Sequence, residues 1–550
     1  MLHRPILRYP KFRCPRNRFF HPASVLILAL ASSLVCTAQV SVTTHHYDNY
    51  RTGWNSQETA LTPATVHSSS FGVLKTIVLD DQVEAQPLVV PGVNITAGKF
   101  KGTTHDVVYV ATDNNSIYAV DVTSGAVLLK PNFGPPVVKP LGCHIYNPDV
   151  GINSTPVIDL SSNTLYAVIY TQQSTAPAYF VHALDLGSLT DKVTPQLVTG
   201  SHTLTDGTTD SFNATYHRQR PALLLANGNV YAAFGSFCDK APNLSRGWLL
   251  GWQTGTLAPL GGNQLTDTQA TSPEDYFLSA IWMSGYGPAA DDSGNILFVT
   301  SNSDPSGTTY DGVTNIQESV VKVSSDLTTV LDLFTPSNVA YLDQNDQDFG
   351  AGGVMVLPDQ PGSTPHLAVA AGKMGSMFFM NEDNLGGFST ETNNVLGTYT
   401  IGPCWCGQSY FVDPRDNAAR VVSSGGSNIM VWKLLTSHAP SLNKVISSPT
   451  LNTVGTGFFT SVSSNGTANP VIWALSRPTG KLTTVYLYAF SPDAGGTTME
   501  QLFLGTAGTW VTNGANTNLI PVVANGKVFV ASYKELVILG LKPKGEAPKN

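Results

Sequence analysis

Short runs of alternating apolar and polar residues, separated by turn-forming residues, recur along most of the chain. In the clearest example, residues 107–111 and 117–122 alternate and are rich in β-branched side chains. Asp113-Asn114-Asn115 lies between these runs and Thr123-Ser124-Gly125 follows them, and both triplets are typical of tight turns. The pattern predicts consecutive short antiparallel strands that form most of one small β-sheet.

Related groups of strands recur every 50–70 residues or so, beginning near Gln86, Thr155, Pro221, Gly287, Gly352, Ser409, Gly457 and Leu519. A single four-stranded sheet cannot bury its own faces, but sheets packed side by side around an axis can, and closing the ring limits exposed edges. We therefore predict an all-β fold, a single eight-bladed β-propeller of four-stranded antiparallel blades over residues 71–541. Residues 71–79 supply the outer strand of the last blade and close the ring, and a pair of β-sandwiches is the competing architecture.

Composition agrees with this prediction, because only 12% of the 550 residues are charged. This is about half the usual share for a soluble protein, and sustained helical periodicity is scarce beyond residue 40. The flanking segments are different. Residues 39–70, which include the adjacent His45 and His46, predict an irregular clasp with the two histidines at the surface, and residues 542–550 form a tail.

The first 38 residues have the layout of a cleavable secretory signal. Six Lys and Arg residues without any acid precede an apolar run over 23–35, and Ala38 is a small residue before Gln39. A membrane anchor is the alternative, but a run of about 13 residues is short for spanning a bilayer. We predict cleavage after Ala38, export to the periplasm or the medium, and no membrane span in the mature protein.

Removing this segment leaves 24 basic and 38 acidic residues, a net charge of about −14. Binding to nucleic acid needs a basic face, so the charge argues against a nucleic-acid partner. The only compact basic cluster, residues 217–220, is predicted to be a solvated loop, with capture of an anion or of a cofactor's carboxylates as the alternative. We expect a monomer.

Four cysteines remain after cleavage. An even number in an exported chain indicates disulfides, and we predict a bond between Cys143 and Cys238, which lie in loops at the edges of adjacent blades. Cys404 and Cys406 either close a small ring or remain two thiols. A metal site is the third alternative for this pair, although two thiolates alone do not complete a tetrahedral site.

One blade carries a motif of a known superfamily. The stretch Ala119-Val-Asp121-Val-Thr-Ser-Gly125-Ala-Val-Leu-Leu129 resembles the A-x-D-x-x-T-G-x-x-x-W signature of pyrroloquinoline quinone (PQQ) propellers. Ser124 replaces Thr, and Leu129 replaces the docking Trp. The chain thus resembles the quinoprotein alcohol dehydrogenase-like superfamily, which contains scaffold proteins as well as enzymes.

The resemblance implies a set of site residues. Lys373 lies in a stretch similar to the P-K-x-G-x-x-Y segment whose Lys contacts the quinone carbonyls, and Trp282 is similar to the Trp on which the quinone stacks. Residues 335–348 resemble the T-P-x-D-x-W-D segment that carries the catalytic base, for which Asp346 is the best match. Asn302 resembles a calcium-binding Asn, and Asp239 is the nearest substitute for a missing calcium-binding Glu. Calcium polarises the quinone carbonyl in that chemistry while a carboxylate takes the alcohol proton.

Several features of that site are missing. The vicinal Cys-Cys pair is absent, and Asn153 stands where the Arg is expected. We therefore expect a binding or scaffold propeller with a degenerate quinone site, which holds a protein or polysaccharide partner. The alternative is an oxidoreductase that uses PQQ and calcium to oxidise a small alcohol or sugar.

Overall fold

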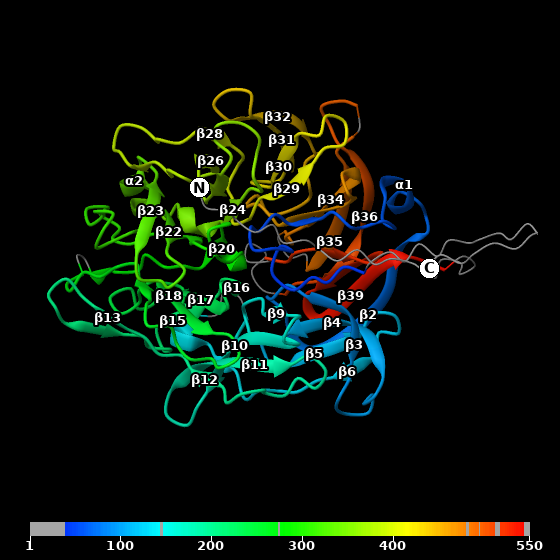
Figure 1. Cartoon of the computed structure of the whole chain (residues 1–550), viewed down its shortest axis with the longest axis horizontal. Helices are drawn as coiled ribbons and strands as arrows, with labels where there is room; N and C mark the ends of the chain where they lie inside the picture. The colour runs from blue at the N-terminus through cyan, green and yellow to red at the C-terminus, as the bar shows by residue number, and fades with distance from the viewer. Residues whose placement is uncertain are drawn as a thin grey trace, which may run out of the picture. The chain divides into compact units, whose positions relative to one another are not determined.

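The computed structural model describes residues 39–543 except 144–146, 273–274, 480–482, 494 and 512–517. The predicted signal sequence and most of the predicted tail lie outside these residues. Eight sheets whose main strands are antiparallel follow one another in chain order around a ring, which confirms the eight-bladed propeller (Figure 1).

The strands of blades 1 to 4 begin close to the predicted positions. In sheet order they are β3 (Leu88–Asn94), β4 (Thr104–Ala111), β5 (Ile117–Asp121) and β6 (Val127–Leu129) in blade 1; β9 (Val157–Asp159), β10 (Thr164–Gln172), β11 (Pro177–Asp185) and β12 (Gln196–Leu197) in blade 2; β15 (His217–Gln219) and β16 (Leu224–Ala226), both paired with β17 (Asn229–Ser236), then β18 (Trp248–Gln253) and β19 (Gln264–Leu265) in blade 3; β20 (Ala289–Ala290), β21 (Ile296–Val299), β22 (Val320–Val323), β23 (Val330–Thr335) and β27 (Gly387–Phe388) in blade 4.

Blades 5 to 8 follow the same plan. Their strands are β24 (Val354–Val356), β25 (Leu367–Ala371), β26 (Ser376–Asn381) and β28 (Gly397–Thr400) in blade 5; β29 (Ser409–Val412), β30 (Ala419–Ser423), β31 (Met430–Leu435) and β32 (Ser441–Ser447) in blade 6; β1 (Trp54–Asn55), β33 (Thr460–Asn465), β34 (Ala468–Leu475), β35 (Thr484–Ser491) and β36 (Glu500–Thr509) in blade 7; β37 (Val522–Ala524), β38 (Lys527–Ala531), β39 (Tyr533–Leu541) and β2 (Phe71–Gln82) in blade 8.

Smaller elements lie between and beside the blades. They are the hairpins β7 (Val137–Val138)–β8 (Asp149–Val150) and β13 (Ser201–Thr203)–β14 (Thr209–Ser211), the helices α1 (Pro63–Val66) and α2 (Val339–Gln344), and the 3₁₀ turns η1 (Pro140–Gly142), η3 (Met283–Gly285) and η4 (Phe349–Ala351). None of the helices in the described part of the chain is long and apolar enough to cross a membrane.

The ring is closed by a strand from the start of the chain, as predicted. β2 pairs antiparallel with β39, and Phe71 lies opposite Leu541. The core is divided into layers between adjacent blades, and the layer between blades 8 and 1 buries Phe529 and Ile538 against Val108. Because each blade buries both faces against its neighbours, the fold needs the complete ring.

Turn chemistry explains why the strands end where they do. Asn525 and Gly526 join β37 to β38, and both have positive φ (53° and 76°). This backbone twist suits a two-residue hairpin, and Asn and Gly adopt it at the lowest steric cost. In the blade-1 motif, the Asp121 carboxylate accepts hydrogen bonds from the Ser124 amide and hydroxyl, both at 2.6 Å, so Ser fulfils the role of Thr in the signature.

Residues 39–58, which we call the N-terminal strap, run across the centre of the ring and contact every blade. The strap bonds to residues in or beside the first strand of each blade, in nearly the same order as the blades: Val42 N to Val89 O (2.8 Å), Ile158 N to Thr43 O (2.8 Å), Asn49 Nδ2 to Leu225 O (2.8 Å), Ala290 N to Asn49 O (2.9 Å), Val356 N to Tyr50 O (3.0 Å), Tyr410 N to Thr52 O (2.8 Å), Val462 N to Gly53 O (2.8 Å) and Asn55 Nδ2 to Val523 O (2.9 Å). The strap therefore occupies the centre of the disc on the face it crosses.

Buried polar side chains fix the strap. Arg51 is fully buried and donates to the carbonyls of His45 (2.9 Å), Leu223 (3.0 Å) and Pro288 (2.9 Å). The prediction of surface histidines was wrong: His45 and His46 are buried and their rings stack 5.2 Å apart. The prediction assumed an extended backbone, whereas His46 has φ of 56°. Burial also lowers the pKa of His46 to about 4.

Candidate functional site

Lys373 lies at the turn between β25 and β26 and is the centre of the candidate site. Its ammonium lies 2.8 Å from Asp346 Oδ1 and 2.8 Å from Asp348 Oδ2, while its backbone N–H donates to Asp348 O (3.0 Å). The turn needs glycine at position 375, because φ is 83° and a Cβ would lie 2.7 Å from the Gly402 carbonyl carbon. The lysine is thus held against the segment that follows α2.

The two carboxylates have different environments. The Asp346 side chain is 74% exposed, whereas that of Asp348 is 4% exposed. Burial raises the pKa of Asp348 to about 7, although the Lys373 charge opposes this shift and the Asp346 charge adds to it. The pKa of Lys373 is raised because its two carboxylates outweigh the effect of burial. Asp348 is therefore the inner partner of the lysine and Asp346 the outer one.

Two further acids form a second layer behind Asp348. Asp343 accepts hydrogen bonds from Ser303 N (2.9 Å) and Gln317 Nε2 (2.5 Å), and burial raises its pKa to about 8. Glu318 is fully buried and accepts a bond from Phe349 N (2.5 Å). Burial, with the charges of Asp348 and Asp343, raises the pKa of Glu318 well above its ordinary value.

Two tryptophans flank the lysine. The Lys373 ammonium lies 5.8 Å from the Trp282 ring centroid and 5.6 Å from that of Trp405, both within the range of a cation–π interaction. Trp282 immediately precedes η3 and Trp405 lies between blades 5 and 6, and both side chains are half-buried. We call Lys373, Asp346, Asp348, Trp282 and Trp405 the Lys373 cluster.

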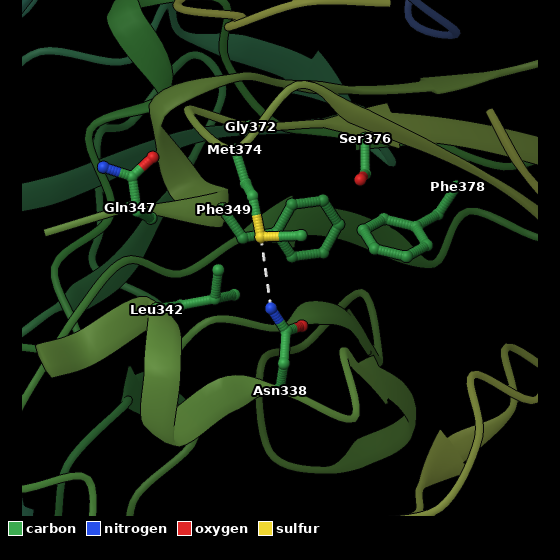
Figure 2. A pocket seen from close by; sticks show the side chains of 8 residues that line it. All are labelled: Asn338, Leu342, Gln347, Phe349, Gly372, Met374, Ser376 and Phe378. Carbon is green, nitrogen blue, oxygen red and sulfur yellow. Dashed lines mark hydrogen bonds between the residues drawn. The ribbon is translucent and has the colours of Figure 1, made fainter. Parts of the chain in front are cut away.

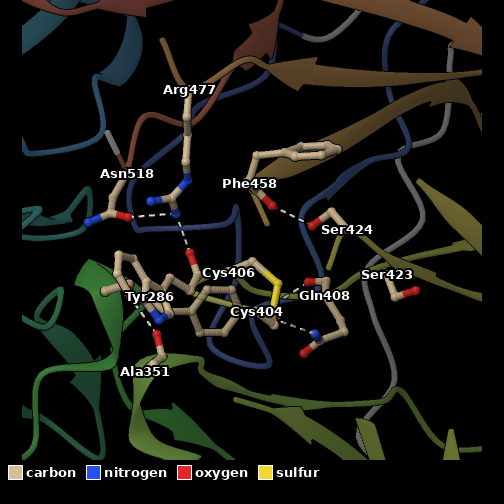
Figure 3. Close-up of a disulfide and its surroundings, with 12 residues drawn as sticks. Tyr286, Ala351, Cys404, Cys406, Gln408, Ser423, Ser424, Phe458, Arg477 and Asn518 are labelled. Carbon is tan, nitrogen blue, oxygen red and sulfur yellow. Dashed lines mark hydrogen bonds between the residues drawn. A yellow bond between two sulfur atoms is a disulfide. The ribbon is translucent and has the colours of Figure 1, made fainter. Parts of the chain in front are cut away.

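A disulfide between Cys404 and Cys406 closes a small ring around Trp405 (Figure 3). Both cysteines are fully buried. The Trp405 backbone N–H donates to Thr456 O (2.8 Å), and its carbonyl accepts a hydrogen bond from buried Arg477, which also donates to Asn518 Oδ1 (2.8 Å). The ring and these bonds fix the backbone on which the Trp405 side chain stands.

The basic segment at 217–220 is not a solvated loop, so that prediction was wrong. Residues 217–219 form β15 and are buried, as is Arg220. Arg218 and Arg220 lie 3.2 and 3.1 Å from Glu84 Oε2, and Arg218 also donates to Asn153 Oδ1 (2.9 Å). The buried Glu84 carboxylate compensates the charge of these buried arginines, and it lies more than 130 residues away from them in the sequence.

The structure brings most of the predicted site residues together. Lys373, Asp346 and Trp282 are in the same cluster. Asp239 is accessible to solvent and bonds to Ser236, and the Lys373 and Asp346 charges both act on it. Surrounding protein nevertheless raises the pKa of Asp239. For Asn302, the backbone carbonyl accepts a hydrogen bond from Ser279 N (2.9 Å).

One predicted disulfide is confirmed, and three residues near Lys373 were not predicted. A disulfide joins Cys143 to Cys238, the predicted pair, next to Asp239. Asp348, Glu318 and Trp405 were missed. Asp348 could have been found by aligning it, instead of Asp346, with the final Asp of the T-P-x-D-x-W-D segment. Trp405 comes from another part of the chain and carried no signal beyond its two flanking cysteines.

The residues around Lys373 do not fit a calcium-bound quinone. Among the described residues, no three His, Cys, Asp or Glu side chains are arranged to hold a metal ion. The lysine is already paired with two carboxylates, and the charge of Asp239 also interacts with it. A cofactor that carries carboxylates would meet like charge here.

A small apolar pocket lies beside the cluster, between α2 and blade 5 (Figure 2). Leu342, Phe349 and Phe378 line it, and Asn338 Nδ2 bonds to Met374 Sδ across it (3.1 Å). Its volume is about 10 Å³, the space of a single water. The pocket is therefore a packing defect next to the site, too small for an organic ligand.

Sequence comparison finds no matching protein family and no matching curated protein. Among solved structures, the fold is similar to that of the quinohemoprotein alcohol dehydrogenase ADHIIG from Pseudomonas putida HK5, with a TM-score of 0.60, 12% identity, and coverage of 93% of this chain and 82% of that one. It is also similar to a europium-containing methanol dehydrogenase, with a TM-score of 0.57, 9% identity, and coverage of 91% and 98%. At these identities the likeness shows the fold alone, an eight-bladed β-propeller.

Proposed function

We propose that this protein is an exported binding propeller in which a quinone-type site has degenerated into a surface for a protein or polysaccharide partner. One observation carries the proposal: the Lys373 ammonium is 2.8 Å from both Asp346 and Asp348. A lysine neutralised by two carboxylates is a poor electrophile for a quinone carbonyl. Export is supported by the basic leader and by the two disulfides, which persist in oxidising compartments.

The test is reconstitution of the purified protein, expressed from the full-length chain, with micromolar PQQ and millimolar Ca²⁺. We expect no saturable change in quinone absorbance and no reduction of an artificial dye with alcohols or aldoses. A La³⁺ series covers the larger ions, since one of the similar structures contains europium.

The second candidate function is a PQQ-dependent alcohol or sugar dehydrogenase. It is favoured by Asp348, because a buried carboxyl with a pKa of about 7 beside a lysine and two tryptophans suits a general base. Saturable quinone binding with dye reduction, lost in Asp348→Asn or Asp346→Asn but kept in the surface control Asp326→Asn, would establish this function and overturn the binding proposal.

A further inference from the structure

We propose that Trp282 and Trp405 form a binding site for a neutral sugar ring, so that the partner of this propeller is an uncharged polysaccharide. The inference rests on the proposed function and names the ligand class of the same site. Both rings lie within 6 Å of the Lys373 ammonium, and both are half-buried, so each keeps accessible surface beside the same polar group. An amphipathic pair of this kind suits a ligand with an apolar face and polar edges.

Charge excludes the competing small ligands. Asp346 and Asp348 both lie 2.8 Å from one ammonium, and the charge of Asp239 also interacts with it. Phosphates, uronic acids and quinone carboxylates would be repelled, whereas a neutral sugar has no charge to oppose. The excess of acceptors also matches a ligand that consists mainly of hydroxyl donors.

The polar groups of the cluster complement sugar hydroxyls. Asp346 is 74% exposed, so its free carboxylate oxygen can accept a charge-assisted hydrogen bond from a hydroxyl. An ammonium has three N–H donors, of which Asp346 and Asp348 take two. Within the described residues the Lys373 ammonium has no third acceptor, which leaves one donor for a hydroxyl or ring oxygen.

The Trp405 side of the site is preorganised. The Cys404–Cys406 ring and the bond from Arg477 hold the Trp405 backbone, and Arg477 is itself fully buried. A rigid aromatic surface loses little conformational freedom on binding. Trp405 therefore serves as the fixed wall of the site, and the disulfide is a positioning element.

The experiment is calorimetric titration of the exported protein with neutral hexasaccharides (cellohexaose, xylohexaose, maltohexaose and chitohexaose), with hexagalacturonate as the charged comparator. We expect saturable binding of at least one neutral sugar and none of hexagalacturonate. Trp282→Ala and Trp405→Ala should each weaken binding about tenfold or more, while Trp282→Phe and Trp405→Phe should keep most of it. Trp54→Ala, a half-buried tryptophan on β1, is the matched control, and the melting temperature of every variant verifies folding.

The results separate the two proposals. If no neutral sugar binds and PQQ does not bind either, the sugar inference is wrong and a binding propeller with another partner remains. If PQQ binds and turns over, the proposed function itself is wrong. Sugar binding that survives the Trp282→Ala/Trp405→Ala double variant would overturn the assignment to these two rings. The Cys404→Ser/Cys406→Ser variant should lose affinity for the same sugar, and unchanged affinity would remove the disulfide from the argument.

Discussion

Replacing Lys373 by Met should destabilise the protein in a way that depends on pH. In the wild type the pKa of Asp348 is about 7, above its ordinary value of 3.8. Between about pH 4 and 7 the folded protein therefore binds more protons at this carboxyl than the unfolded chain does. The free energy of unfolding falls as the pH rises through this range and is constant above it. Without the lysine charge, the pKa of Asp348 rises further. The variant therefore continues to lose stability above pH 7, where the wild type does not.

The magnitude follows from this linkage. Each pH unit above 7 costs the variant about 1.4 kcal/mol, or about 2 kcal/mol at about pH 8.5. This is below the 3–5 kcal/mol or so that a buried ion forced to stay charged would cost, because Asp348 escapes by taking up a proton. An unfolding entropy of about 2.1 cal/mol/K per residue over roughly 500 residues converts 1 kcal/mol to about 1 °C. We expect an extra loss of about 2 °C in melting temperature at the higher pH.

Differential scanning calorimetry at about pH 5.5, 7 and 8.5 tests this prediction. Lys433→Met is the matched control, because Lys433 and Asp416 form a pair 2.8 Å apart with both side chains one-third exposed, worth about 0–1 kcal/mol. The double variant Lys373→Met/Asp348→Asn should lose the pH dependence. A deficit of equal size at all three pH values, or one that persists in the double variant, would refute the reasoning.

Three other predictions concern the fold and its processing. Gly353→Ala should lower the melting temperature by several degrees or prevent folding, because its Cβ would lie 2.0 Å from Tyr286 Cδ1, whereas Gly261→Ala, with no atom within 4 Å, should have little effect; equal melting temperatures would contradict the close approach. Arg51→Met should cost about 3 kcal/mol or more, because it leaves buried carbonyls without donors, and thermal denaturation that shows no loss would mean that the strap is not needed for stability. N-terminal sequencing of the exported protein should begin at Gln39, and a different first residue would refute the cleavage prediction.

The blades were predictable because local signals agree with the global fold. Each blade begins near its predicted residue, since strand alternation and turn pairs such as Asn525-Gly526 act over a few residues. Ring closure by residues 71–79 was also predictable, because a propeller leaves one blade short of a strand and this segment was the apolar run available.

The site was less predictable, because its residues come from different blades and lie close together only when the ring has formed. Lys373 and Trp282 followed from short motifs, but Trp405 and Arg477 come from other blades and no spacing in the sequence connects them. Asp346 and Asp348 lie two residues apart in the same segment, and only their burial in the folded protein distinguishes them. The strap gave no periodic signal, since its polar groups bond to eight separate strands rather than to one neighbour.

The path of the strap determines when its contacts can form during folding. Its residues are the first of the described chain to be synthesised, yet Asn55 and Tyr47 bond to Val523 in the eighth blade, and β2 pairs with the final strand. This N-terminal segment therefore cannot form all of its contacts until nearly the whole polypeptide has been synthesised. Folding of the strap therefore depends on contacts made by the last blade.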